Sequence, residues 1–509
     1  MADRPNLLIL MADQLAPRVL QAYGGPVART PHIDALAREG VVFDSFYCNS
    51  PLCAPSRFSF MAGQLPSRIG AYDNAAEFPA QVPTFAHYLR SAGYHTALSG
   101  KMHFCGPDQL HGFEERLTTD IYPADFGWTP DWTRPGERPG WYHTIDSVTQ
   151  AGPCTRTNQI DFDDEVVVAA RQKLFDIARG KDRRPFCLVV SLTHPHDPYV
   201  IPEPYWNRYQ DAEIDMPRVA DRAAAQDPHS QRLRHVIGLN LARPTEAQVR
   251  AARRAYYGAV SYVDDQIGSL VATLRQAALE RNTVIVILAD HGDMLGERGL
   301  WYKMSFYEAA CRIPLIVHAP GRFMPHRVGC TASLLDMLPT LVTLAHNGTE
   351  PTYAAPIDGR NLLATLEQAA GREDTGGEAI GEYLAEGAIA PIVMIRRGRY
   401  KFVHSSADPD QLYDLIADPD ELENLASHAS RASIAEEFRA EVARRWALPE
   451  LHQAVLASQQ RRHFVYAALR TGRYQPWDFQ PLRDASCLYI RNDQQLGDLE
   501  DVARFPRLA

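Results

Sequence analysis

Residues 7–13, Leu7-Leu8-Ile9-Leu10-Met11-Ala12-Asp13, decide the fold of this chain because they form a continuous apolar run that ends in a carboxylate. A short run without polar alternation predicts a strand buried on both faces, as in a parallel sheet. The same pattern, an apolar run leading into a polar cluster, recurs at residues 94–98 before Gly100-Lys101-Met102-His103, at 186–192 before His194-Pro195-His196-Asp197, and at 283–289 before Asp290-His291-Gly292-Asp293. Four strands therefore end in groups that can bind or react.

Helical segments at residues 162–178 and 246–274 separate these runs. Strands that alternate with helices predict an α/β fold, with a mixed, mostly parallel sheet sandwiched by helices. Ligands of such sheets bind beyond the carboxyl ends of the strands, so we expect the four polar clusters to form one site. Taken singly, each cluster is also compatible with an ordinary turn.

The composition changes after about residue 345, where Gly, Pro and Glu become frequent up to Gly376-Gly377. This change predicts a boundary, so we expect a catalytic domain at residues 1–375. Residues 376–473 are expected to form a smaller α+β domain, with a hairpin around Arg397-Gly398-Arg399 and two helices up to about residue 470. The extended tail at 474–509 is expected to pack on the body or on a neighbouring subunit.

The overall composition is that of a globular protein, with 45% hydrophobic residues and a net charge of −10. This charge gives no bias toward nucleic acid. The apolar run at 7–12 is too short to span a membrane and no signal-peptide cleavage site follows it, so we expect a cytoplasmic protein without membrane association. The eight cysteines lack Cys-x-x-Cys spacing, which indicates free thiols in a reducing compartment.

A second informative stretch is Cys53-Ala54-Pro55-Ser56-Arg57. Pro55 suits the first turn of a helix, and Arg57 is suited to binding an oxyanion close to Cys53. Only five of the 52 basic residues are lysine, and two of them, Lys101 and Lys303, lie among polar motifs. A compact ammonium has a more tunable pKa than a guanidinium, so we expect these lysines to be required. The alternative is an ordinary buried cysteine beside lysines retained by chance.

Six blocks share a pattern known from one family: Met11-Ala12-Asp13-Gln14-Leu15, residues 49–57, Gly70-Ala71-Tyr72-Asp73-Asn74-Ala75, Gly100-Lys101-Met102-His103, residues 193–198 and Ala289-Asp290-His291-Gly292-Asp293. Through them the chain resembles the sulfatase branch of the alkaline phosphatase superfamily, and the choline sulfatases within it. The resemblance runs nearly end to end and implies an alkaline-phosphatase-like fold. It also implies that a formylglycine-generating enzyme oxidises Cys53 to formylglycine, whose hydrate attacks sulfur with one hydroxyl and releases sulfate with the other.

The resemblance implies roles for the remaining polar residues. The positions that match those around the sulfuryl oxygens are Arg57, Lys101, His196 and Lys303. His103 matches the base that takes the proton of the second hydroxyl, and either His196 or Lys303 protonates the departing alkyl oxygen. Asn74 is implied as a neutral donor to the sulfate.

Divalent-metal ligation is implied for four residues, Asp13, Gln14, Asp290 and His291. Many arylsulfatases have an aspartate and an asparagine where this chain has Gln14 and His291. Oxygen ligands favour a hard cation, so calcium is the expected ion. The imidazole makes manganese a rival, with magnesium as a further alternative. His291 is also compatible with a purely structural role at the end of a strand.

The region between Tyr122 and His143 is rich in aromatic residues, namely Phe126, Trp128, Trp132, Trp141 and Tyr142. A quaternary ammonium has no hydrogen-bond donor and is held by aromatic faces and nearby anionic charge. By resemblance, Trp128 is the expected ring for the cation, with His143 beside it. Glu382 is preferred to Glu386 as the compensating charge. The alternative is that these rings pack a loop against the core.

The resemblance implies an enzyme that hydrolyses choline O-sulfate to choline and sulfate. A phosphonate monoester or phosphodiester hydrolase of the same superfamily is the alternative. A non-catalytic protein that binds a sulfated osmolyte, with an unmodified cysteine, is the alternative from another class. The family resemblance also implies a homo-oligomer, either a tetramer or a dimer.

Overall fold

The computed structural model describes residues 4–221, 226–368, 376–482, 495 and 497–498. An eight-stranded sheet lies at its centre, with the strand order β10-β2-β9-β8-β1-β6-β3-β4. Its strands are β1 Asn6–Ala12, β2 Val41–Tyr47, β3 His95–Gly100, β4 Glu115–Arg116, β6 Phe186–Leu192, β8 Thr283–Ala289, β9 Leu315–His318 and β10 His326–Ser333. The four strands predicted from apolar runs are therefore present.

The central strands lie parallel and in register, so that they end at the same level of the sheet. Ala12 at the end of β1 pairs with Leu192 of β6 on one side and with Ala289 of β8 on the other. All residues of β6 and β8 are buried, as continuous apolar runs require. Strand β9 runs antiparallel to β2 and β8, which makes the sheet mixed.

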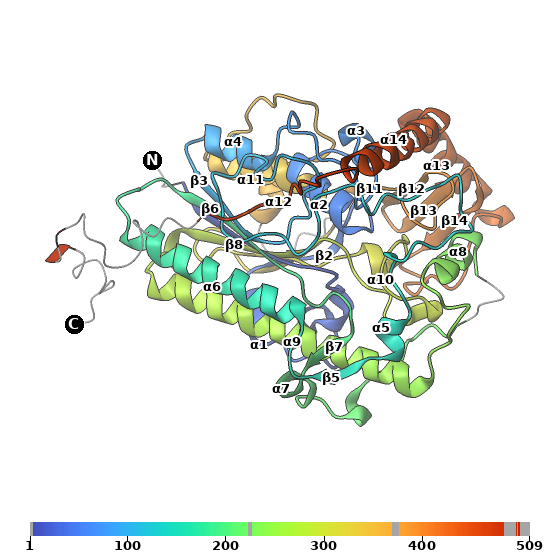
Figure 1. Cartoon of the computed structure of the whole chain (residues 1–509), viewed down its shortest axis with the longest axis horizontal. Helices are drawn as coiled ribbons and strands as arrows, with labels where there is room; N and C mark the ends of the chain where they lie inside the picture. Colours follow the sequence, from blue (N-terminus) through green and yellow to red (C-terminus); the bar gives the residue numbers. More distant parts are fainter. Residues whose placement is uncertain (1–3, 222–225, 369–375, 483–494, 496, 499–509) are drawn as a thin grey trace.

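Helices cover both faces of this sheet (Figure 1). On one face, α6 Asn158–Arg179 lies beside α9 Glu246–Gln276, and α1 Pro31–Arg38 packs on α9. On the other face lie α2 Cys53–Ala62, α4 Phe85–Ser91 and α11 Met337–Ala345. Shorter elements complete this part: α3 Pro66–Ile69, β5 Gly152–Cys154, α5 Asp146–Thr149, β7 Val200–Pro202, α7 Glu203–Trp206, α8 Pro228–Val236, α10 Glu308–Cys311 and α12 Leu363–Leu366.

The carboxyl-terminal part contains a four-stranded antiparallel sheet in the order β11-β12-β13-β14. Its elements are β11 Glu378–Tyr383, β12 Ile392–Arg397, β13 Tyr400–Ser405, β14 Asp408–Asp414, α13 Ala432–Arg445 and α14 Leu448–Leu469. The hairpin predicted around Gly398 joins β12 to β13. Helix α13 packs on this sheet, with the ring of Phe438 stacked on that of Phe402 at 5.4 Å. The predicted α/β fold with a smaller α+β part is confirmed.

The boundary predicted after residue 375 stays a prediction, because the two sheets share a continuous apolar core. Met394 and Val403 of the small sheet belong to the same buried cluster as β1 and β8. At the start of the tail, Tyr474 donates a hydrogen bond to Asp125 at 2.5 Å and Trp477 packs edge-on against Phe126. Most of the tail beyond residue 482 lies outside the described residues. Among the described helices, none has the length and apolarity needed to cross a bilayer.

A buried ion-pair group joins the small sheet to α10, and its loss is predicted to destabilise the fold. Lys401 of β13 is fully buried, and its ammonium lies 2.8 Å from Glu308 and 2.6 Å from Glu421. Substituting Lys401→Met removes the ammonium that pairs with both buried carboxylates, so the free energy of unfolding should fall by about 3–5 kcal/mol in chemical denaturation. Lys173→Met, which breaks a partly exposed pair with Glu115, should cost less than about 1 kcal/mol. Equal losses in the two variants would contradict this prediction.

Candidate active site

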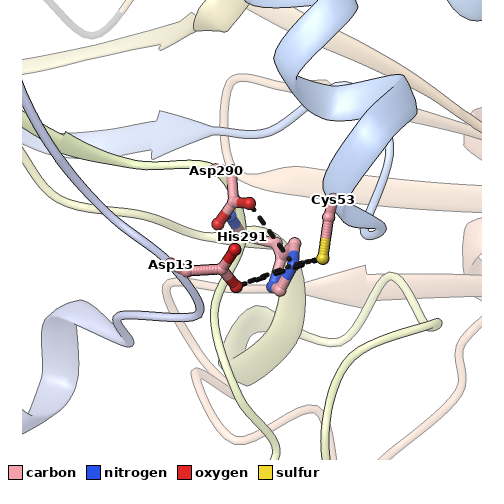
Figure 2. A group of neighbouring side chains, drawn as sticks. All are labelled: Asp13, Cys53, Asp290 and His291. Atoms are coloured by element: carbon pink, nitrogen blue, oxygen red, sulfur yellow. Dashed lines mark hydrogen bonds and ion pairs between the residues drawn. The ribbon is translucent and has the colours of Figure 1, made fainter. Parts of the chain in front are cut away.

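The polar clusters that follow the parallel strands meet at one point with the first residue of α2. Figure 2 shows Asp13, Asp290 and His291 directed toward the thiol of Cys53. The Cys53 sulfur lies 3.3 Å from Nε2 of His291 and 4.0 Å from Oδ1 of Asp13. One ligand atom from each of these four buried residues lies within 4.8 Å of the others. The predicted convergence of separate strand ends is therefore present.

Local contacts at the start of α2 fix the position of Cys53. The Oδ1 atom of Asn74 accepts a hydrogen bond from the backbone N–H of Ala54 at 2.9 Å, which satisfies one of the free donors of the first turn. The hydroxyl of Ser56 donates to the backbone carbonyl of Asp290 at 2.5 Å. The amino end of α2 is thereby attached to the end of β8. The helix dipole places partial positive charge at residue 53.

Arg57 binds both carboxylates of the site. Its Nη2 donates to Asp13 and its Nε to Asp290, each at 2.8 Å, and all three side chains are fully buried. Its Nη1 donates to the carbonyl of Lys101 and to the hydroxyl of Ser191. In this arrangement the guanidinium faces the carboxylates and the strand ends, and Arg57 is absent from the residues that line the cavity above Cys53.

Two of the five lysines complete the positive charge around residue 53. Lys101 forms an ion pair with Asp13, and its ammonium lies 4.3 Å from the ring centre of Tyr122. Lys303 lies 2.7 Å from Oε1 of Gln14 and 2.7 Å from Nε2 of His196. Burial alone would raise the pKa of the Cys53 thiol, but the positive charge of Lys101 and Lys303 opposes it, and that pKa lies well below its usual value. The surroundings therefore favour negative charge at position 53.

The donor set of Asp13, Asp290 and His291 fits a divalent cation. Nδ1 of His291 contacts the carbonyl of Gly292 at 3.0 Å, which assigns the ring proton to Nδ1 and leaves the lone pair of Nε2 facing the two carboxylates. Two carboxylates with one imidazole suit hard and borderline ions. Gln14 lies beside them, but its amide is hydrogen-bonded to Lys303 and, through Nε2, to Asp293.

His103 is buried, and neither of its ring nitrogens has a hydrogen-bond partner in the described part of the chain. Its backbone N–H donates to Asp120, and its ring contacts those of Tyr122 and Trp128 at 5.0 and 5.8 Å between centroids. A buried imidazole without a protein partner requires an explanation, and a bound substrate or water would supply the missing hydrogen bonds.

A cavity of about 250 Å³ opens above Cys53. The residues of its wall used below are Cys53, Asn74, Trp128, Trp141, His143, His196 and Glu386. The rings of Trp128 and Trp141 lie nearly parallel with centroids 6.4 Å apart. Nδ1 of His143 lies 3.3 Å from Asp197, and its ring stacks on Tyr302. The cavity thus joins the charged centre to an aromatic wall.

The structure reverses the predicted preference between the two glutamates. Glu382 is absent from the cavity wall, because its carboxylate accepts hydrogen bonds from the N–H and hydroxyl of Ser67 and from the indole of Trp446. Glu386 lines the cavity, and its Oε2 has no hydrogen-bond partner among the described residues. Burial raises the pKa of Glu386 to about 7. Glu382 lies near the end of β11 and Glu386 follows shortly after the strand, so only three-dimensional packing separates their roles.

Sequence reasoning missed two residues that support the site. Asp293 accepts hydrogen bonds from Nε2 of Gln14 at 2.7 Å and from the hydroxyl of Tyr199 at 2.8 Å, so it orients the Gln14 amide. Tyr122 lies under the Lys101 ammonium. Asp293 stands in the polar cluster after β8, and its position two residues after His291 was the available signal. Tyr122 carried no signal beyond its place in an aromatic-rich segment.

A family model described as "Sulfatase" matches residues 5–347. The chain belongs to the sulfatase family. This sulfatase is accordingly a sulfuric ester hydrolase of the alkaline phosphatase superfamily. Models described as "N-sulphoglucosamine sulphohydrolase, C-terminal" and "Choline sulfatase enzyme C terminal" match residues 296–447 and 453–505.

Individual relatives agree with this assignment. The sulfatase is 49% identical over 513 residues to a choline-sulfatase of Rhizobium meliloti (strain 1021), covering 99% of each chain. It is 29% identical to the uncharacterized sulfatase YidJ of Escherichia coli (strain K12) over 83% of each chain. Its fold is similar to that of a phosphonate monoester hydrolase of Agrobacterium radiobacter, with a TM-score of 0.67, 23% identity and coverage of 88% of this chain and 96% of the other.

Replacing Arg57 by lysine is predicted to remove most of the activity. A lysine keeps the positive charge but cannot donate to both Asp13 and Asp290 in the geometry of the guanidinium. The two carboxylates should therefore move apart. Because displacements near 1 Å cost about 10²-fold in rate, kcat of the variant on a sulfate ester should fall by about that factor. Arg253→Lys, at a buried arginine of α9 outside the cavity wall, is the matched control. Activity of Arg57→Lys within fivefold of the parent would contradict this view of the site.

Proposed function

We propose that this sulfatase hydrolyses choline O-sulfate to choline and sulfate at position 53. The observation that carries the proposal is the pairing, in one cavity, of an unpartnered carboxylate and an aromatic wall with the charged centre around Cys53. Identity of 49% to a choline-sulfatase, and the match of residues 453–505 to the choline-sulfatase carboxyl-terminal model, support the same substrate.

The aromatic end of the cavity suits a trimethylammonium group. Such a cation cannot donate hydrogen bonds, so its affinity comes from ring faces and from charge. Trp128 and Trp141 offer ring faces, and Glu386 offers a carboxylate whose Oε2 no described protein group engages. A cation compensates that carboxylate without needing a hydrogen bond. Glu386 takes the role that the sequence interpretation gave to Glu382.

The opposite end of the cavity suits the sulfate ester. Lys101 and Lys303 bring positive charge to residue 53, where charge develops on the sulfuryl oxygens. The Oδ1 atom of Asn74 is occupied by the backbone of Ala54, so its amide nitrogen is left to donate to the sulfate. His103 has both ring nitrogens available and acts as the base.

Protonation of the departing choline oxygen comes from the pair formed by Lys303 and His196. Nδ1 of His196 contacts the carbonyl of Asp197 at 2.7 Å, which assigns its proton there and makes Nε2 the acceptor of a hydrogen bond from Lys303. Lys303 holds the proton in this arrangement and can deliver it directly, or through His196 once Nε2 has taken the proton along their shared hydrogen bond. The requirement for a proton donor is specific to alkyl esters, whose leaving groups are strongly basic.

Two groups supplied after synthesis complete the site in this proposal. Formylglycine at position 53 supplies a hydrated aldehyde as nucleophile. A divalent cation, calcium with manganese or magnesium as alternatives, supplies Lewis acidity and would be held by Asp13, Asp290 and His291, with Gln14 beside them. The proposal further includes maturation by a formylglycine-generating enzyme, a cytoplasmic location and assembly as a tetramer or dimer.

The central test compares substrates with the matured enzyme. Choline sulfate should give a kcat/KM at least about tenfold above that of a phenylphosphonate monoester, because only the former fills the cation end of the cavity. Cys53→Ala should reduce turnover to the background rate while the melting temperature stays close to that of the parent. A preference for the phosphonate would favour the alternative hydrolase. Tight binding without turnover, with an intact thiol in the Cys53 peptide by mass spectrometry, would indicate a binding protein.

Choline binding is predicted to weaken in acid through Glu386. Its pKa of about 7 lies above the ordinary glutamate value, so the carboxylate is ionised above pH 7 and becomes neutral below it. The attraction to the cation is therefore present at high pH and lost as the pH falls, and the Kd of choline should rise about tenfold between pH 7.5 and pH 6. Calorimetry on Glu386→Gln should give weak, pH-independent binding. Identical pH profiles for Glu386→Gln and the parent would remove Glu386 from the cation site.

A further inference from the structure

We infer that Arg462, on helix α14, is a positioning residue that sets the walls of the substrate cavity; the identity of the cation in the cavity rests on the function proposed above. Arg462 is buried and is absent from the residues that line the cavity. It therefore acts through the groups it holds. Those groups belong to two loops that are distant in sequence from α14 and from each other.

The first connection leads to the nucleophile. Arg462 forms a bidentate ion pair with Asp73, with nitrogen–oxygen distances of 2.7 and 2.6 Å, and Asp73 is fully buried. Asp73 directly precedes Asn74, which lines the cavity and binds the first turn of α2 at Ala54. A buried carboxylate without its counter-charge would be strongly unfavourable, so the Asp73–Asn74 segment depends on Arg462 for its position.

The second connection leads to the aromatic wall. Nη1 of Arg462 also donates to the hydroxyl of Thr129 at 3.0 Å, and Thr129 directly follows Trp128. The next residue of α14, His463, contacts the carbonyl of Pro130 at 3.1 Å. The Trp128 loop is thus attached to α14 by consecutive residues of the helix. The guanidinium of Arg462 thus holds the Asp73–Asn74 segment and the Trp128–Thr129 segment at a fixed separation.

The third connection leads to Glu386 in the cavity wall. It starts from Gln459, which lies three residues before Arg462 and on the same face of α14. Its Oε1 accepts a hydrogen bond from the backbone of Trp132 at 2.9 Å. The indole of Trp132 donates to the carbonyl of Ala385 at 2.9 Å, and Ala385 precedes Glu386. Helix α14 therefore contacts all three walls: Asn74 through Asp73, Trp128 through Thr129, and Glu386 through Trp132.

The choline-sulfatase carboxyl-terminal model matches residues 453–505, a range that includes Gln459, Arg462 and His463. Sulfatase chemistry itself lies in the part matched by the sulfatase model, residues 5–347. The contacts of α14 give a physical reason for the association of this carboxyl-terminal segment with one substrate class. Helix α14 does not contact the reacting atoms. It sets the distance between residue 53 and the part of the cavity wall formed by Trp128 and Glu386.

The test uses the matured enzyme and three variants of the connection. Thr129→Val removes the hydrogen bond from Arg462 and the one that the Thr129 hydroxyl donates to the carbonyl of Phe126, and it keeps the ion pair. Arg462→Met removes both connections, and Arg462→Lys restores part of the charge. The matched control is Arg253→Met, since Arg253 is similarly buried and bound to Asp215 and the carbonyl of Leu295, away from the cavity wall.

Two readouts separate positioning from general stability. The ratio of kcat/KM for choline sulfate to that for 4-nitrophenyl sulfate should fall about tenfold in Arg462→Met, and less in Thr129→Val and Arg462→Lys. Hydrogen–deuterium exchange of residues 126–134 should increase in Arg462→Met, which leaves the hydrogen bond from Thr129 to Phe126 in place, and also in Thr129→Val, which removes it. Arg253→Met should lower the melting temperature while leaving the ratio within twofold and the exchange of 126–134 unchanged.

The outcomes distinguish this inference from the proposed function. An Arg462→Met protein with an unchanged ratio and unchanged exchange of residues 126–134 would overturn the positioning role. If Arg462→Met does not fold, unchanged values in Thr129→Val and Arg462→Lys would do the same. A parent enzyme that does not hydrolyse choline sulfate would refute the proposed function, and the exchange measurement would still decide the role of Arg462.

Discussion

The arrangement of this sulfatase depends on one buried guanidinium between two carboxylates. Parallel, in-register strands bring Asp13 and Asp290 to the same edge of the sheet, where like charges would repel each other in a medium of low polarity. Arg57 donates to both and also to the end of β3 and to Ser191 of β6. Because Arg57 lies one helical turn after Cys53, the interaction that neutralises the strand ends also sets the position of the reactive residue.

The charged centre is built on backbone conformations that ordinary side chains rarely adopt. Gln14, His103, Tyr302 and Met304 all have positive φ angles, between 59° and 70°. Each such position costs of order 1–3 kcal/mol and persists only where neighbouring contacts fix it. Tyr302 and Met304 flank Lys303, and their backbone groups are bound by Met294, Asp293 and Pro51. These positions include Gln14 and His103 and flank Lys303, so the strained backbone coincides with functional groups of the charged centre.

The parts of this structure that could be predicted from sequence are those with local signals. Strands buried on both faces are continuous apolar runs, so β6 and β8 were predicted with their observed bounds. The strand β9 was not predicted, because a run of four apolar residues is too short to distinguish a strand from another buried segment. The choice between Glu382 and Glu386 failed for a different reason: it depends on whether Ser67 and Trp446 lie nearby, and both are far away in the sequence. The scarcity of lysine was a useful signal, since Lys101, Lys303 and Lys401 are all fully buried.

The burial of Cys53 has a consequence for the order of events in biosynthesis. Its side chain is only 1% exposed, and every residue of α2 is buried between the sheet and the helices around it. Another enzyme's catalytic groups cannot reach this thiol without displacing α2 from the strand ends to which Arg57 and Ser56 attach it. Any enzymatic oxidation of Cys53 therefore has to occur on the nascent or unfolded chain, and folding closes the opportunity for modification.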